Sequence, residues 1–169
     1  MSLIERYRVL YEHEKDSSDK MLAMLGSVPE AGRGEARFQQ AVTVAGHLAA
    51  CRENWLDRVT GQGSGQADWY DEGCDLAALR PRFAALESRW TEYLAGLSDD
   101  RLAQDFEFTE GGQSFHLPAE VQVEQLFSHA AYHRGQIALL VDQLGGRTVD
   151  TDYVDWWWAK REEARGPGD

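Results

Sequence analysis

Long apolar runs and cysteines are both scarce in this chain of 169 residues, and each scarcity excludes a class of protein. No run of about 18 apolar residues is present, which excludes a membrane-spanning helix. The N-terminal segment carries a charge every few residues, unlike the uninterrupted apolar stretch of a secretory signal. Two cysteines, Cys51 and Cys74, are too few for a disulfide scaffold. These features favour a reducing, cytoplasmic location.

Basic residues are also scarce, with 17 Lys and Arg against 29 Asp and Glu, which gives a formal net charge of −12. An acidic chain repels phosphate backbones, so the balance disfavours nucleic acid as a partner. The hydrophobic fraction of 43% is typical of a globular protein rather than a disordered one. The length suits one domain, so we expect residues 1–169 to form a single domain with a frayed tail over residues 166–169.

Four stretches place apolar residues at the three-four spacing of a helix with one buried face. Glycine- and proline-rich turns and one long polar loop separate them, and Ser98 to Asp100 is expected to end the third. Pro81 predicts either a kink in that third helix or a late start. The pattern predicts a mainly all-α protein built as a four-helix bundle. The predicted helices span residues 3–25, 35–59, 76–97 and 119–144.

The spacing of apolar residues changes from the three-four helical pattern to alternation between residues 103 and 117. There, aromatic and polar residues alternate on both sides of Gly111-Gly112. This pattern predicts a small β-hairpin before the last long helix, packed on the helices because an isolated hairpin is only marginally stable. Residues 153–158 predict a short terminal helix. Its three consecutive tryptophans, Trp156 to Trp158, cannot all lie on one face of a helix. They either pack the helix against the bundle, or at least one of them covers the mouth of a site or contacts a dimer partner.

Three histidines are candidates for metal chemistry. His129 and His133 lie four residues apart, so their imidazoles point the same way and can share one ion, or bond to water or carbonyl groups instead. His47 can join them if residues 35–59 and 119–144 form neighbouring helices. Three imidazoles leave one position of a tetrahedral ion open, as in catalytic sites. Cys51, one turn beyond His47, is either a fourth ligand that closes the site or a small core hydrophobe.

Three further polar residues are candidates for a supporting role or for substrate contact. Glu14, with Ser18, interrupts the apolar face of the first helix, so it either lines the cavity as a base or ligand partner, or is solvated. Gln136 is three residues past His133 and can lie beside the metal. Arg134 is rotated away and can hold the hairpin or a carboxylate. Purely structural roles are the alternative for both.

The segment HAAYHRGQI, residues 129–137, resembles the HxxxHRGQ signature of the DinB-like (DinB/YfiT) family. An upstream histidine, here His47 followed by Trp55, and a glycine-turned hairpin before the last helix belong to the same pattern. The resemblance implies a four-helix bundle of unusual connectivity that is often a homodimer. It also implies a divalent metal ion, most often nickel or zinc, held by His47, His129 and His133.

The same fold is similar to that of bacterial thiol S-transferases and mycothiol-dependent maleylpyruvate isomerases, in which a metal is thought to activate a low-molecular-weight thiol. The resemblance therefore implies a metal-dependent transferase that joins a small thiol to an electrophilic small molecule. Water in the open position would make the protein a hydrolase instead. The alternative is a non-catalytic, metal-stabilised interaction module.

Overall fold

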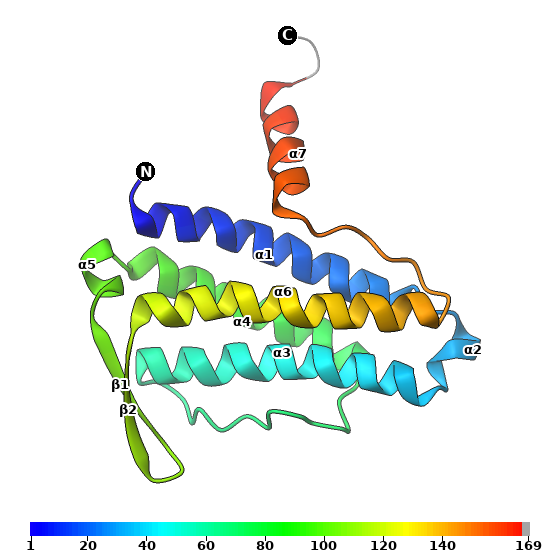
Figure 1. The fold of residues 1–169 in the computed structure, drawn as a ribbon, viewed down its shortest axis with the longest axis horizontal. Helices are drawn as coiled ribbons and strands as arrows, with labels where there is room; N and C mark the ends of the chain where they lie inside the picture. The colour runs from blue at the N-terminus through cyan, green and yellow to red at the C-terminus, as the bar shows by residue number, and fades with distance from the viewer. Residues whose placement is uncertain (167–169) are drawn as a thin grey trace.

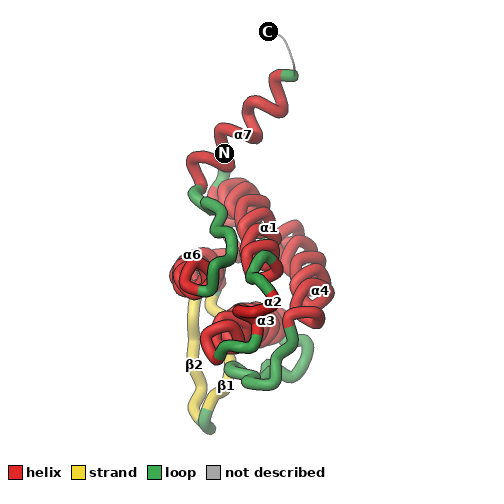
Figure 2. The backbone as a smooth tube through the Cα atoms, turned by 90° about the vertical axis from the view of Figure 1, so that its right-hand side faces the viewer, coloured by secondary structure: helices red, strands yellow, loops and turns green. Residues whose placement is uncertain are grey.

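Four long helices form the body of the protein and confirm the predicted mainly all-α bundle (Figure 1). The computed structural model describes residues 1–166, so the rest of the expected frayed tail lies outside the described residues. Viewed nearly along their axes, the four helices surround a common core (Figure 2). They are α1 (Leu3–Gly26), α3 (Ala36–Thr60), α4 (Leu76–Gly96) and α6 (Ala119–Gln143), with the short α2 (Glu30–Arg33) between the first two.

One expectation about α4 needs correction. The helix does not start late, because the Asp75 carboxylate accepts a hydrogen bond from the Ala77 backbone N–H and caps the helix before Leu76, with Pro81 inside it. The helix ends at Gly96, within a residue of the predicted end. The sequence analysis missed a further short helix, α5 (Asp99–Leu102), which begins where the Ser98 hydroxyl accepts a hydrogen bond from the Arg101 backbone N–H.

The predicted hairpin is present between α5 and α6. Strands β1 (Asp105–Glu110) and β2 (Gln113–Pro118) pair antiparallel. Gly111 and Gly112 form the turn with φ angles of 57° and 78°, which favour glycine. The Phe108 ring of β1 lies 5.3 Å from the Trp55 ring of α3, so the hairpin is anchored at one end of the bundle, as expected.

A polar layer divides the bundle core into two apolar clusters. One cluster packs around Leu25, Phe83 and Ile137, and the other around Tyr11 and Trp90. Between them α1, α3 and α6 bury charged and imidazole side chains instead of apolar ones. Among residues 1–166, no helix combines the length and the apolar content that crossing a bilayer requires.

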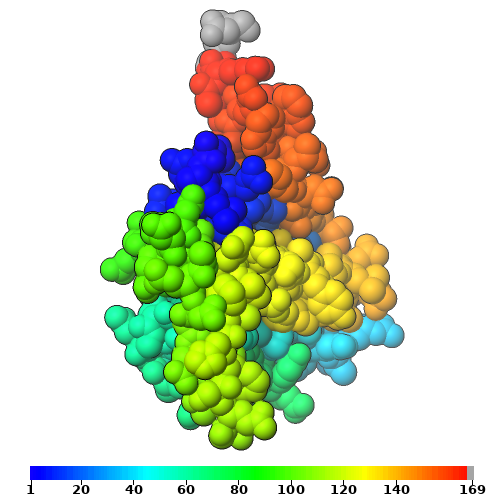
Figure 3. Space-filling model, turned by 60° about the vertical axis from the view of Figure 1, so that its left-hand side comes forward, coloured from blue at the N-terminus to red at the C-terminus, as the bar shows by residue number. Residues whose placement is uncertain are grey.

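The C-terminal helix α7 (Tyr153–Arg165) stands clear of the bundle and is longer than the predicted short segment (Figures 1 and 3). Its first turn packs on α1, where Trp156 is buried with its ring 5.5 Å from that of His13. The Thr151 carbonyl accepts a hydrogen bond from His13 Nε2 at 2.8 Å. Trp158 is 53% exposed. One tryptophan therefore packs the helix against the bundle while another faces solvent.

Candidate metal centre

Three imidazoles converge where α3 and α6 pack side by side. His47 comes from α3, and His129 and His133 come from successive turns of α6. The His129 Nε2 atom lies 3.3 Å from His47 Nε2 and 3.1 Å from His133 Nε2. The ring centroids of His47 and His133 are 4.9 Å apart. The structure thus brings together three side chains separated by as many as 86 residues of chain, since 133 − 47 = 86.

In two of these rings the outer nitrogen, Nδ1, which points away from the cluster, is hydrogen-bonded to an oxygen atom. His47 Nδ1 lies 2.7 Å from the Trp69 carbonyl oxygen, and His133 Nδ1 lies 2.6 Å from Gln136 Oε1. Carbonyl oxygens only accept hydrogen bonds, so both Nδ1 atoms carry the proton. The lone pair of each neutral ring therefore lies on Nε2, the atom that faces His129.

This arrangement of lone pairs fits a cation. A proton on His129 Nε2 can be donated to one neighbouring Nε2 atom but not to both, which leaves the other buried lone pair without a donor. A divalent ion among the three nitrogens would bind all of their lone pairs. Imidazole nitrogens are preferred ligands of zinc and nickel, and three of them leave a coordination position open. The donor set therefore fits the metal that the sequence predicts.

Burial keeps His47 and His129 unprotonated at neutral pH. It lowers the pKa of His129 to about 4, and the neighbouring His133, His47 and Arg52 act in the same direction. Burial also lowers the pKa of His47, partly opposed by the hydrogen bond to Trp69. A metal ion would therefore not have to displace a proton from these two rings at pH 7.

Cys51 lies close enough to be an additional ligand. Its Sγ atom is 3.5 Å from His47 Nε2, and the donor atoms of His47, Cys51 and His129 all lie within 4.8 Å of one another. Burial raises the pKa of the thiol to about 12, so without a metal the sulfur keeps its proton. A coordinated thiol loses that proton. His47, Cys51 and His129 thus form one group of donors close enough to share an ion, and His133 adds a nitrogen beside that of His129.

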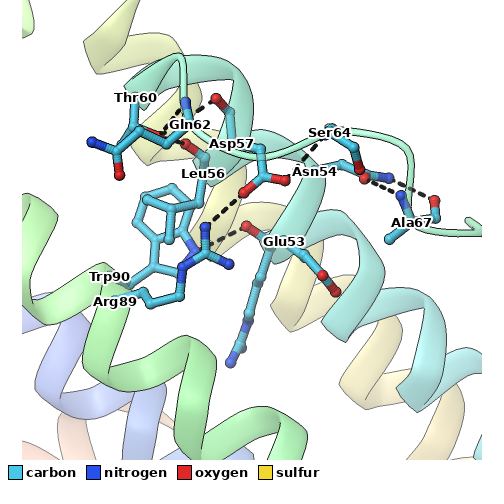
Figure 4. A network of polar contacts seen from close by, with 12 residues as sticks. Glu53, Asn54, Leu56, Asp57, Thr60, Gln62, Ser64, Ala67, Arg89 and Trp90 are labelled. Carbon is cyan, nitrogen blue, oxygen red and sulfur yellow. Dashed lines mark hydrogen bonds and ion pairs between the residues drawn. The ribbon is translucent and has the colours of Figure 1, made fainter.

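The long loop between α3 and α4 is tied to α3 by buried polar side chains (Figure 4). Asn54 donates to the Ala67 carbonyl at 2.9 Å and accepts from its N–H at 2.6 Å. Asp57 accepts from the Gly65 N–H at 3.0 Å and is paired with Arg89 at 2.6 Å. These contacts fix the path of a segment that has no regular secondary structure.

That loop delivers two site residues that the sequence analysis missed. The Trp69 carbonyl sets the tautomer of His47, and the Tyr70 ring stacks on the His47 ring with centroids 4.1 Å apart and planes 6° from parallel. The available signal was a pair of adjacent aromatic residues in an otherwise polar loop. A backbone carbonyl has no signature of its own in the sequence.

A buried charge cluster lies in the polar layer and contains the two remaining candidates. Glu14 is 1% exposed, so the solvated alternative is wrong. Both of its carboxylate oxygens accept from Arg134 Nη1 at 2.7 Å, and Arg52, which also donates to Ser18, pairs with it too. Arg134 therefore holds a carboxylate, one of its predicted alternatives. The analysis missed Arg52, whose signal was a charge on the apolar face of a helix.

Comparison with known proteins adds one match. A family model described as the DinB family matches residues 2–165, which is nearly the whole chain. Neither the curated proteins nor the solved structures contain a match. The matched region includes the helices that carry the three histidines and the loop that orients His47.

Proposed function

The chain belongs to the DinB family, and from that premise we propose that it binds a divalent metal ion, nickel or zinc, through Nε2 of His47, His129 and His133. The observation that carries the proposal is the convergence of three Nε2 atoms with two of the outer nitrogens already hydrogen-bonded. Such outer partners fix the tautomer and the orientation of metal-ligating histidines.

We further propose a metal-dependent thiol S-transferase, in which the open coordination position takes a low-molecular-weight thiol. A bound divalent ion would supply Lewis acidity, which keeps a coordinated thiol deprotonated. The sulfur would form a C–S bond to an electrophilic carbon, whose leaving group would depart with the bonding electron pair, while the thiol proton would pass to solvent. The Trp69 carbonyl and the Gln136 side chain accept hydrogen bonds from the imidazole Nδ1–H groups and so orient the Nε2 atoms of His47 and His133 toward the proposed metal position. Water in place of the thiol would give the related hydrolase.

Replacing any one of the three histidines by alanine tests the metal site. We expect each variant to lose metal affinity by more than the roughly 10–100-fold that removal of a ligand's hydrogen-bond partner costs. Metal analysis after dialysis, with titration calorimetry for zinc and nickel, measures the loss. His116→Ala is the matched control, because His116 is exposed on β2. One ion per chain retained in all three variants would contradict the assignment.

The position of Cys51 favours a second candidate, a non-catalytic module in which the metal is structural. Coordination by its Sγ atom would close the site. X-ray absorption of the zinc-loaded protein, with Cys51→Ser for comparison, separates the two candidates. Sulfur among the ligands in the wild type and not in the variant supports the closed site. Nitrogen and oxygen ligands alone, with sulfur appearing when a small thiol is added, support the transferase.

We also propose that the protein is a cytoplasmic homodimer that binds neither nucleic acid nor membrane. Both cysteines are buried and unpaired, which suits a reducing compartment. The net charge of −12 opposes binding to phosphate backbones. Sedimentation equilibrium that gives twice the chain mass, and no gel shift with DNA at physiological ionic strength, are the expected results.

A further inference from the structure

An open groove of about 600 Å³ adjoins the histidine cluster between α3, α6 and the loop that carries Tyr70. His133 and Gln136 form part of its wall, so the groove and the candidate metal centre share residues. Tyr132 and Leu139 extend the wall along α6. The volume lies within the roughly 300–1,000 Å³ of small-molecule sites.

The groove is free of formal charge. No described residue that lines it carries a carboxylate, guanidinium or ammonium group, although 27% of the chain is charged. The other large groove, about 570 Å³ between the same loop and the hairpin, shows the contrast, because Asp57, Arg58, Asp68, Glu107 and Glu110 line it. An ionic ligand in the uncharged groove would lose hydration with no opposite charge to replace it. The lining therefore favours a neutral ligand.

The groove also exposes large apolar side chains. Tyr132 is 65% exposed, Leu139 59% and Tyr70 56%. Large apolar side chains gathered in one exposed hollow mark an interaction site. The two tyrosines flank the metal centre, since the Tyr70 ring stacks on His47 and the Tyr132 ring lies 5.0 Å from the His133 ring. A flat ligand against these rings would lie next to the imidazoles.

We propose that this groove binds the neutral, aromatic or apolar part of a small-molecule substrate and holds it beside the histidine cluster. The inference rests on the proposed function for the reaction that follows, but the binding step depends on the groove alone. It narrows the electrophile to an uncharged molecule with an apolar face. The neutral hydrogen-bonding groups of the lining, including the Gln136 amide and two tyrosine hydroxyls, suit such a ligand.

Three probes that share one ring but differ in charge test the inference: benzyl alcohol, benzoate and benzylammonium. Amide chemical shifts of the metal-free and zinc-loaded protein report where each probe binds. We expect benzyl alcohol to shift Tyr70, Tyr132 and Leu139 in both forms, and the two ions to bind at least tenfold more weakly to the metal-free form, in which no cation lies beside the groove. Equal binding of either ion to the metal-free form, or no shift at these residues, would overturn the proposal.

A pair of variants on α6 provides the control. Leu139→Glu places a carboxylate in the groove, whereas Val121→Glu places one on another exposed apolar position of the same helix, 44% exposed and outside the groove lining. We expect Leu139→Glu to weaken benzyl alcohol binding at least tenfold and Val121→Glu to leave it unchanged. Equal effects in the two variants would contradict the inference.

Metal content and oligomeric mass, measured on the same samples, distinguish failure of the groove proposal from failure of the proposed metal site. Full metal loading without probe binding refutes the groove and leaves the metal site standing. Probe binding without metal loading refutes the metal site alone. If instead a second copy of the chain fills the groove, the wild type excludes the probe and Leu139→Glu lowers the oligomeric mass, which also refutes the proposal.

Discussion

A single half-buried ring, His129, sets the proton chemistry of the candidate centre. It is the ring on which the other two Nε2 atoms converge, and burial lowers its pKa to about 4 from an ordinary value of 6.5. The unfolded chain therefore binds a proton at this position between about pH 6.5 and pH 4, while the folded metal-free protein does not. Stability must fall as the pH falls through this window.

We expect metal-free wild type to lose about 2 kcal/mol more stability between pH 7 and pH 4 than the His129→Asn variant does, after allowance for partial exposure of the ring. Urea unfolding at the two pH values, with chelator present throughout, measures the difference. The other titratable groups are the same in both proteins, so their contribution to the pH dependence cancels when the two proteins are compared. The same pH dependence in both proteins would show that His129 does not titrate as its burial requires.

At the scale of elements, Glu14 joins three helices. It lies on α1 and accepts from Arg52 of α3 and Arg134 of α6. The carboxylate is shared by two guanidinium groups, and all three residues are at most 5% exposed. Removing the negative charge would leave two buried cations without a counter-ion.

Glu14→Gln should therefore cost about 3–5 kcal/mol of unfolding free energy. Glu12→Gln is the control, because Glu12 pairs with Lys15 on the surface with its side chain 57% exposed, and such pairs contribute at most about 1 kcal/mol. Denaturant unfolding of both variants at pH 7 measures the two costs. A loss for Glu14→Gln no larger than that for Glu12→Gln would mean that the cluster does not hold the helices together.

Element boundaries were predictable where the signal is local. The apolar spacing within α1 and α6 depends on helix geometry alone, and both helices end within a residue or two of the prediction. The end of α4 was predicted to within a residue, but the short α5 was missed because a serine marks the end of one helix and the start of the next equally well. The length of α7 was underestimated because beyond Trp158 it is charged and exposed, without an apolar face to mark it.

At the scale of the whole molecule, metal binding should act on global stability. The candidate ligands lie on two helices that pack together, so a bound ion would stabilise the folded state and not the separated helices. Ligand binding to the native state alone adds about 2.7 kcal/mol at a free metal concentration of 100 times Kd.

We expect zinc to raise the Tm of wild type and of His116→Ala alike, and chelator to reverse the rise. His133→Ala should show little or no rise at the same zinc concentration. Differential scanning calorimetry with and without zinc measures the three shifts. An equal rise in His133→Ala would place the stabilising metal elsewhere on the molecule, for instance on exposed carboxylates.

The sequence by itself determined the helices, the hairpin and the direction shared by His129 and His133, because backbone geometry within one element fixes where side chains four residues apart point. Only the tertiary structure decided that His47 meets this pair, that Glu14 is buried between two arginines, and that an uncharged groove borders the cluster. The tertiary structure also placed the Trp69 carbonyl against His47 Nδ1, and this contact fixes the tautomer of the ring. Such contacts join elements far apart in the chain, and every residue has a backbone carbonyl, so no local pattern marks the one that matters.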